Sequence, residues 1–286
     1  MQMLRSWLFI PGSDVRKLEK VRQLTADAVI YDLEDAVAPA EKESARLKVK
    51  AALTSNQDII QIVRVNGQQT PYFTEDLREV VCSELHGIML PKTESPEQIA
   101  DLVKLLELLE QRLGLNRHIR IIPLIETAVG VRNADQIAQA GERVQCLAFG
   151  SIDYSLDIGA ELTQEGWELL YPRSILVNAS RAAGLQQPID TVYPHLNDSE
   201  GLKRETNFIK KMGFQGKLAI HPNQIEPIHD VYAPSAEEVQ SAMKIVEVYE
   251  KSLREGNGAV MLDGNMIDLP VVERAKKIIH MGRLLK

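Results

Sequence analysis

The feature that most constrains the fold is an alternation that repeats eight times along the chain. Each repeat has a short apolar or β-branched run, then a polar turn, then a stretch with the periodicity of an amphipathic helix. The runs lie at residues 7–10, 28–32, 59–65, 87–91, 119–126, 147–150, 189–193 and 217–220. Eight strands that alternate with helices favour a closed (β/α)8 barrel, the TIM-barrel fold, over an open doubly wound sheet.

The stretches between and after these runs carry helix signals. The predicted helices are residues 13–24, 39–53, 74–83, 96–113, 129–140, 166–183, 199–212 and 225–231. Ser95 precedes a first-turn proline, Pro96, which is typical of a helix start. Gly114 and Gly213 follow long helical stretches, as C-terminal caps do.

The pattern changes near residue 234. Residues 235–254 predict a long amphipathic helix, and the sequence AVMLDGNMID predicts a hairpin that turns at Asp263-Gly264. Pro270 then opens a last helix over residues 271–281. We therefore predict a barrel domain over residues 1–233 and a C-terminal helical and hairpin extension over residues 234–286, too small to be an independent domain.

Charge and composition argue against several classes of function. A net charge of −7 does not favour binding to nucleic acid or to an anionic membrane. No segment approaches the roughly 18–20 continuous apolar residues of a membrane span. Cys82 and Cys146 are far apart, so they suggest reduced thiols rather than a metal site or a disulfide framework. We expect a cytoplasmic protein.

Polar residues follow most of the predicted strands. In a barrel of this kind the C-terminal ends of the strands converge at one mouth, where active sites form. The polar residues in these positions are Asp32, Glu34, Asp35, Arg64, Asn66, Lys92, Glu126, Asp153 and His221. Each could be an ordinary loop residue, but their joint occurrence predicts a functional site at the mouth.

Glu126 and Asp153 follow consecutive strands and should be neighbours. Two carboxylates with room for waters and substrate oxygens suit Mg²⁺, which seldom uses a complete protein cage. The alternative is that both residues cap the N-termini of the helices that follow.

Arg64 would present a planar set of donors at the same mouth, suited to the carboxylate of a small acid. Alternatively it pairs with Asp32, Glu34 and Asp35, and both roles can coexist. The backbone N–H groups of the GSID segment, from Gly150 on, suggest an anion cradle. Lys92 is the one reasonable candidate for a Schiff-base lysine, although it follows Pro91 in a polar turn.

Eight motifs in this order resemble the citrate lyase β-subunit family, within the HpcH/HpaI aldolase superfamily that also includes citramalyl-CoA and malyl-CoA lyases. They are RSWLFIP from Arg5, DLEDAV, RVNG, PKTES, PLIET, FGSIDY, AIHP and LDGNMIDLP. The match runs nearly end to end, which is a strong signal for the family and a weaker one for the substrate.

The resemblance implies a barrel that assembles as a homotrimer and binds Mg²⁺ through Glu126 and Asp153. It implies that an oxo-acid carboxylate binds to Arg64 and to the backbone of Gly150, Ser151 and Ile152. It also places Glu34 and Asp35 around the metal and its waters, and we expect Asp32 beside them as the least certain of the three.

The resemblance further implies that Asp268, in the C-terminal extension, enters a neighbouring subunit's active site. There it would protonate the enolate carbon during carbon–carbon cleavage. Basic residues near the mouth are candidates for the phosphates of coenzyme A, with a solvated helix face as the alternative. These candidates are Arg16, Lys17, Lys20 and Lys92.

Three functions follow from this sequence. The first is a free-standing Mg-dependent lyase that cleaves citramalyl-CoA or malyl-CoA to acetyl-CoA and a 2-oxo acid. The second is a citrate lyase β subunit that acts on citryl-acyl-carrier protein beside a transferase subunit and releases oxaloacetate. The third is a non-catalytic barrel that binds an oxo acid or an acyl carrier.

Overall fold

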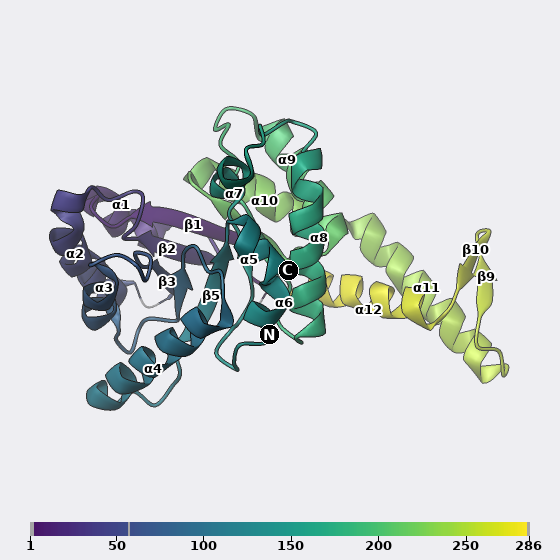
Figure 1. Ribbon diagram of the computed structural model, residues 1–286. Helices are drawn as coiled ribbons and strands as arrows, with labels where there is room; N and C mark the ends of the chain where they lie inside the picture. The colour runs from purple at the N-terminus through teal and green to yellow at the C-terminus, as the bar shows by residue number, and fades with distance from the viewer. Residues whose placement is uncertain (1–2, 57, 285–286) are drawn as a thin grey trace. The chain divides into compact units, whose positions relative to one another are not determined.

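The computed structural model describes residues 3–56 and 58–284, and it confirms the predicted barrel (Figure 1). Eight parallel strands pair in sequence order, and β8 returns to pair with β1. The strands are β1 (Ser6–Pro11), β2 (Ala28–Asp32), β3 (Ile60–Arg64), β4 (Gly87–Leu90), β5 (Arg120–Ile125), β6 (Ala148–Phe149), β7 (Ile189–Asp190) and β8 (Gly216–Ala219). Every predicted run contains or overlaps one of these strands.

Helices surround the strands, and Figure 1 shows α1 to α4 outside β1 to β5. The helices of this part are α1 (Val15–Lys20), α2 (Lys42–Ser55), α3 (Phe73–Val80), α4 (Pro96–Leu113), α5 (Ala128–Arg132), α6 (Ala134–Ala138), α7 (Ser151–Ile158), α8 (Leu170–Ala182), α9 (Ser199–Met212) and α10 (Ile225–Tyr232). Short 3-10 turns lie at Val21–Gln23, Pro39–Glu41, Trp167–Leu169 and Pro222–Gln224.

Two of these helices depart from the sequence-based prediction. The helix predicted at residues 129–140 is broken at Asn133, which stands between α5 and α6 and whose side chain donates to Glu94 O at 2.7 Å. Helix α7, directly after β6, was not predicted, because four of its eight residues are Ser or Asp and the segment resembles a loop. It carries one of the predicted site residues, Asp153.

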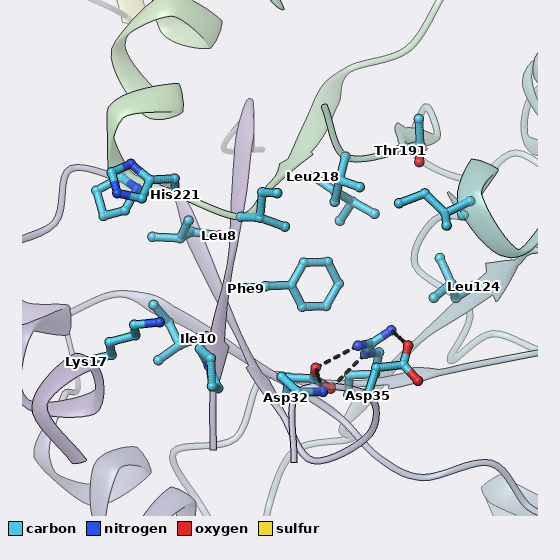
Figure 2. Close-up of a pocket in the computed structure, with 18 of the residues that line it drawn as sticks. Leu8, Phe9, Ile10, Lys17, Asp32, Asp35, Leu124, Thr191, Leu218 and His221 are labelled. Atoms are coloured by element: carbon cyan, nitrogen blue, oxygen red, sulfur yellow. Dashed lines mark hydrogen bonds and ion pairs between the residues drawn. The ribbon is translucent and has the colours of Figure 1, made fainter. Parts of the chain in front are cut away.

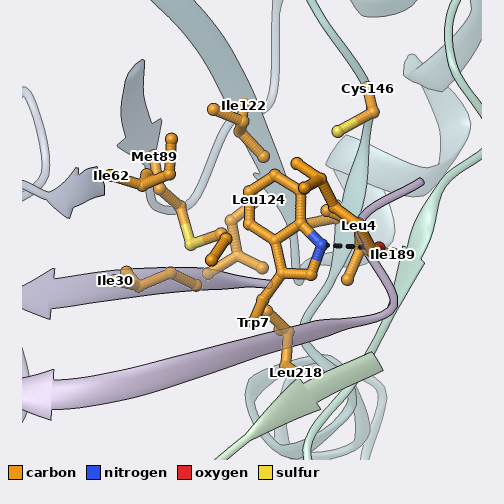
Figure 3. Close-up of a cluster of buried hydrophobic side chains, with 12 residues drawn as sticks. Leu4, Trp7, Ile30, Ile62, Met89, Ile122, Leu124, Cys146, Ile189 and Leu218 are labelled. Atoms are coloured by element: carbon orange, nitrogen blue, oxygen red, sulfur yellow. Dashed lines mark hydrogen bonds between the residues drawn. The ribbon is translucent and has the colours of Figure 1, made fainter. Parts of the chain in front are cut away.

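The inside of the barrel is apolar and closed below the mouth. Trp7, on β1, lies among the buried side chains of the interior, and its indole N–H donates to Leu4 O at 3.1 Å (Figure 3). Cys146 belongs to the same buried cluster, and it and Cys82 are free thiols. Because this core fills the lower barrel, ligands have access only to side chains at the strand ends.

The chain divides into two compact units between Ile228 and His229, within α10. The second unit contains α11 (Ala236–Arg254), the hairpin strands β9 (Val260–Leu262) and β10 (Asn265–Ile267), and α12 (Leu269–Leu284). Figure 1 shows α11 and α12 side by side, with the hairpin beside α11. Tyr249, Ile267 and Val272 form its small buried core. The long helix, the hairpin and the last helix all occur in the predicted order.

None of the helices in residues 3–56 and 58–284 has the length and apolar character needed to cross a lipid bilayer.

Candidate active site

A cavity of about 600 Å³ lies at the C-terminal ends of the strands (Figure 2). Residues from several strand ends and from helix α1 line it. They include Phe9, Lys17, Lys20, Asp32, Asp35, Arg64, Leu124, Glu126, Gly150, Ile152, Asp153, Thr191, Leu218 and His221. Most of the polar residues predicted at the mouth therefore share one cavity.

Arg64 is held by three carboxylates. The strand register aligns it with Asp32, which accepts its Nε–H at 2.8 Å and an Nη2–H at 2.6 Å. Its Nη1 atom lies 3.1 Å from Glu34 Oε2 and 3.3 Å from Asp35 Oδ2. The guanidinium also stacks over the Phe9 ring, 4.8 Å from the ring centroid. The pairing proposed from the sequence as one of two roles for Arg64 is therefore present.

The turn that follows β2 is held from both sides. Asp32 accepts the N–H groups of Glu34 at 2.9 Å and Ala36 at 3.1 Å. Lys42, buried at the start of α2, donates at 2.7 Å to Leu33 O, Glu34 O and Asn66 Oδ1. These bonds fix the backbone that carries Glu34. Sequence reasoning missed Lys42, because no pattern distinguishes this lysine from others on a helix face.

Glu126 is buried directly after β5, against Gly150. Ile125 and Phe149 are in register, so the residues that follow them face each other. A Cβ atom at Gly150 would come within 2.6 Å of Glu126 Oε2, so the glycine makes room for the carboxylate. Glu126 Oε1 accepts the backbone N–H of Lys92 at 2.8 Å, and Lys92 has a left-handed φ of 46°.

Asp153 lies in the first turn of α7, next to the same lysine. Its Oδ1 atom is 3.7 Å from Lys92 Nζ. Neither Glu126 nor Asp153 occupies an N-cap position, although Asp153 lies in the first turn of α7, where the helix dipole favours a negative charge. Thr127 caps α5 by accepting the N–H of Gly130, and Gly150 stands at the cap position of α7. The two carboxylates are therefore available for a ligand.

The GSID segment supplies fewer open N–H groups than its sequence suggests. Gly150 N–H donates to Ile125 O at 3.0 Å, and Ser151 N–H donates to Thr191 Oγ1 at 3.0 Å. The next two N–H groups, of Ile152 and Asp153, lie in the first turn of α7, where an α-helix leaves donors without intrahelical partners. An anion cradle on this segment would rely on these two.

Burial and crowding disfavour negative charge at the mouth. Burial raises the pKa of Glu126 to about 8, and the charges of Glu34 and Asp153 act in the same direction. Burial likewise raises the pKa of Glu34 to about 7, against the opposing charge of Arg64. A divalent cation between such groups would offset this cost.

The donor set fits a hard cation. In residues 3–56 and 58–284 no group of three or more His, Cys, Asp or Glu side chains is arranged to hold a metal ion. Glu126 and Asp153 offer two carboxylates beside an open cavity, and Mg²⁺ commonly takes one or two carboxylates and completes its shell with waters and substrate oxygens. These residues could hold Mg²⁺ in that way.

Not every predicted site residue is among those that line the cavity: Glu34, Lys92 and Ser151 are next to lining residues or bonded to them. Arg16 is exposed on α1 and does not line the cavity, whereas Lys17 and Lys20 on the same helix do. Asp268 belongs to the second compact unit, between β10 and α12. Its Oδ1 atom accepts the N–H of Val271 at 3.3 Å.

Comparison with known proteins identifies the family. A sequence profile described as HpcH/HpaI aldolase/citrate lyase matches residues 5–222, which include all eight barrel strands. The chain belongs to the HpcH/HpaI aldolase/citrate lyase family. A second profile, described as a C–C bond lyase of the TIM-barrel fold, matches residues 171–283.

The similarity to two relatives that are named as lyases spans nearly all of this chain. Citrate lyase subunit beta of Haemophilus influenzae is 38% identical over 99% of this chain and 98% of its own. Citramalyl-CoA lyase, mitochondrial, of Homo sapiens is 32% identical over 99% of this chain and 86% of its own. The family predicted from the motifs is confirmed, and this chain is a carbon–carbon lyase.

A solved structure shows what one relative binds. Protein CitE from Mycobacterium tuberculosis, in complex with magnesium, acetoacetate and coenzyme A, has a TM-score of 0.81 to this chain at 29% identity. The similarity covers 98% of both chains.

Proposed function

We propose that this lyase uses Mg²⁺ to cleave a 3-hydroxyacyl-CoA thioester of the citramalyl-CoA or malyl-CoA type. The products would be acetyl-CoA and a 2-oxo acid. The observation that carries the proposal is that Glu126, Asp153 and Arg64 line one cavity, which Lys17 and Lys20 also line. The magnesium, acetoacetate and coenzyme A bound by the Mycobacterium tuberculosis relative support the same ligands here.

Glu126 and Asp153 are the proposed Mg²⁺ ligands. When bound, Mg²⁺ would polarise the hydroxyl and carboxylate oxygens of the substrate and lower the pKa of the hydroxyl. The N–H of Lys92 orients Glu126, and Gly150 leaves the space that its carboxylate occupies. Glu34 and Asp35 would face the waters around the ion.

Arg64 would bind the carboxylate of the oxo-acid half. Asp32 occupies the Nε and Nη2 atoms and keeps the guanidinium plane fixed. The contact from Nη1 to Asp35 is long, at 3.3 Å, and the Asp35 side chain is 64% exposed. A substrate carboxylate can displace this weak contact and pair with Nη1, supported by the first N–H groups of α7.

The proton that completes the reaction would come from Asp268. The substrate hydroxyl would give up its proton to water in the open cavity as the carbon–carbon bond breaks, and the enolate of the acetyl thioester that remains needs a proton at carbon. We propose that Asp268 supplies it from a neighbouring subunit of a homotrimer in the cytoplasm. An acid on a separate segment can close over the substrate and exclude water from the enolate.

The cavity has a basic side for the thioester carrier. Lys17 and Lys20 line it from α1, and Figure 2 shows Lys17 on the opposite side of the view from Leu124. The phosphates of coenzyme A are suitable partners for such exposed ammonium groups.

A second candidate is the cleavage of citryl-acyl-carrier protein to oxaloacetate, beside a carrier and a transferase subunit. The sequence identity favours it, because the citrate lyase β subunit of Haemophilus influenzae is 38% identical and the human citramalyl-CoA lyase 32%. The reaction at the mouth would be the same, and the carrier would differ.

The test is an activity screen of the purified protein with Mg²⁺. Citramalyl-CoA, malyl-CoA, citryl-CoA and citryl-acyl-carrier protein are each supplied, and the products are identified by mass spectrometry. Turnover of a CoA thioester alone supports the first proposal, and turnover of the carrier-bound substrate alone supports the second. No cleavage of any of the four contradicts both.

Three variants sharpen the screen. Lys17→Ala with Lys20→Ala should raise the KM for the CoA thioester about tenfold or more, as expected for lost phosphate contacts. Arg16→Ala is the matched control on the same helix and should leave KM unchanged. Asp268→Asn should abolish turnover but keep Mg²⁺ binding, and surviving turnover would contradict the role of Asp268.

A further inference from the structure

The barrel is weakly joined between β6 and β7, next to the site. Every residue from Trp7 to Pro11 in β1 pairs with β2. By contrast, a single residue pair, Ala148 with Ile189, joins β6 to β7. The main-chain ladder therefore ends before the mouth, at the point where the chain leaves β6 for Gly150 and α7.

The side chain of Thr191 continues the joint beyond the ladder. Thr191 follows the last residue of β7 and is 2% exposed. Its Oγ1 atom accepts the backbone N–H of Ser151 at 3.0 Å and lies 2.8 Å from Ser151 Oγ. A hydroxyl thus occupies the place where a backbone carbonyl would accept the next bond of a longer strand pair.

The residue before Thr191 is fixed by buried ion pairs. Asp190 accepts Arg173 Nε–H at 2.8 Å and Nη2–H at 2.9 Å, and it accepts Lys217 Nζ at 2.9 Å. Both cationic side chains are at most 1% exposed. The end of β7 is therefore anchored to α8 and β8, and Thr191 projects from a rigid support.

We infer that Thr191 is the positioning residue that sets the start of α7 and, through it, Asp153. Ser151 is the first residue of α7, and Asp153 stands two residues further on. Loss of the Thr191 hydroxyl would leave the buried Ser151 N–H without its acceptor and would free the first turn to shift. A shift of this turn moves both the Asp153 carboxylate and the N–H groups of the proposed anion cradle. The inference rests on the proposed function for its consequence at the metal.

The test compares Thr191→Val with Thr191→Ser in the full chain. Valine keeps the size and removes the hydroxyl, and serine keeps the hydroxyl. Thr206→Val is a matched control, because Thr206 is fully buried and its hydroxyl donates to Leu202 O at 2.7 Å on α9, away from the cavity. Mg²⁺ affinity is measured by calorimetry without substrate, and amide hydrogen exchange is followed by mass spectrometry.

We expect Thr191→Val to weaken Mg²⁺ binding about tenfold or more, the usual range for residues that orient a metal ligand. It should also speed exchange in residues 151–158. Thr191→Ser should restore both, and Thr206→Val should leave both unchanged. If amide exchange at residues 151–158 is as slow in Thr191→Val as in the wild type, the inference is overturned, regardless of the Mg²⁺ affinity of the variant. If exchange in Thr191→Val is faster as expected but the wild-type protein binds no Mg²⁺, the proposed function is overturned. The positioning role of Thr191 is then still supported.

Discussion

Two clusters of charged side chains lie at barrel strands. In each, a buried arginine donates two hydrogen bonds to a buried aspartate. The mouth cluster contains Asp32, Glu34, Asp35, Arg64 and Glu126. The wall cluster, outside β7 and β8, contains Arg173, Asp190, Glu205 and Lys217. The geometry of the two arginines is alike, but the balance of charge is different.

The wall cluster is electrically balanced, because it has two cations for two carboxylates. Arg173 and Lys217 hold the pKa of Asp190 below its usual range, although burial acts in the opposite direction. At the mouth, five carboxylates outnumber three cations: Asp32, Glu34, Asp35, Glu126 and Asp153 lie beside Arg64, Lys42 and Lys92, and burial raises the pKa of Glu126 to about 8. We conclude that the wall cluster supports the barrel, whereas the mouth cluster is left incomplete for a cation and a substrate.

The largest effect is expected from Glu126→Gln. Removing a proposed Mg²⁺ ligand should lower kcat/KM by about 10³-fold or more, because metal polarisation contributes several kcal/mol to such reactions. The free energy of unfolding without metal should not fall at pH 8, since the amide removes a buried carboxylate that burial disfavours. Steady-state kinetics and urea unfolding measure the two quantities. A variant still saturable by Mg²⁺ would contradict the ligand role.

Asp190→Asn should have the opposite effects to Glu126→Gln: it should lower the free energy of unfolding and leave Mg²⁺ binding nearly unchanged. It leaves Arg173 and Lys217 with less negative charge in a buried setting, which should cost about 3 kcal/mol of unfolding free energy. At a temperature where the variant is folded, Mg²⁺ affinity should stay within a few-fold of wild type, because Asn keeps the β7 backbone in place. A stable variant with lost metal binding would mean that the Asp190 ion pairs, and not the β7 backbone alone, hold Thr191 and through it Asp153 in place.

Much of this contrast follows from the sequence. The eight runs predict the strands because burial on both faces leaves an apolar signature. The convergence of strand ends then predicts that Asp32, Arg64, Glu126 and Asp153 share a mouth, which the cavity shows. The sequence did not decide whether Arg64 pairs with nearby carboxylates or binds a substrate carboxylate. The structure shows that Asp32 accepts hydrogen bonds from its Nε and Nη2 atoms.

The supporting residues could not be predicted, for a physical reason. Thr191 matters because β6 and β7 pair so briefly, and strand length is the least certain property of a sequence-based assignment. Lys42 matters because α2 begins where its ammonium reaches Leu33 O, a contact between elements nine residues apart. Both roles depend on three-dimensional distances that no local pattern encodes.

The unbalanced mouth also predicts a pH dependence. Because burial raises the pKa of Glu126 to about 8 and that of Glu34 to about 7, the folded state without metal holds more protons than the unfolded chain between about pH 4.5 and 8. Its stability should therefore fall as pH rises through this window. Mg²⁺ should bind up to about tenfold more tightly per pH unit, with proton release, as pH rises toward 8.

Thermal unfolding at pH 6, 7 and 8, with and without Mg²⁺, measures this effect. The rise in Tm on adding Mg²⁺ should be largest at pH 8, and it should be absent at all three pH values in Glu126→Gln. Asp190→Asn is the control and should retain the wild-type pH trend. An Mg²⁺ effect that weakens as pH rises would contradict the assignment of the buried carboxylates.

The smallest effect concerns Lys92, which contacts both proposed ligands: its backbone N–H donates to Glu126 and its ammonium lies beside Asp153. Its Nζ atom is 3.7 Å from Asp153 Oδ1 and its side chain is 54% exposed, so it offsets the mouth charge only weakly. Removing the ammonium in Lys92→Met should strengthen Mg²⁺ binding about two- to fivefold, because the ion meets a more negative site. Lys92→Gly should give the same gain, since the backbone N–H to Glu126 remains.

The two Lys92 variants should differ in stability alone. The left-handed φ of 46° costs a residue with a Cβ atom about 1 kcal/mol, and glycine adopts it freely. The free energy of unfolding of Lys92→Gly should therefore be up to about 1 kcal/mol higher than that of Lys92→Met, so the glycine variant is the more stable. Calorimetry at low salt measures the affinities, where screening is least. Weaker Mg²⁺ binding in both variants would show that the ammonium organises Asp153 rather than competing with the ion, and the surplus charge of the mouth would no longer explain its affinity for a cation.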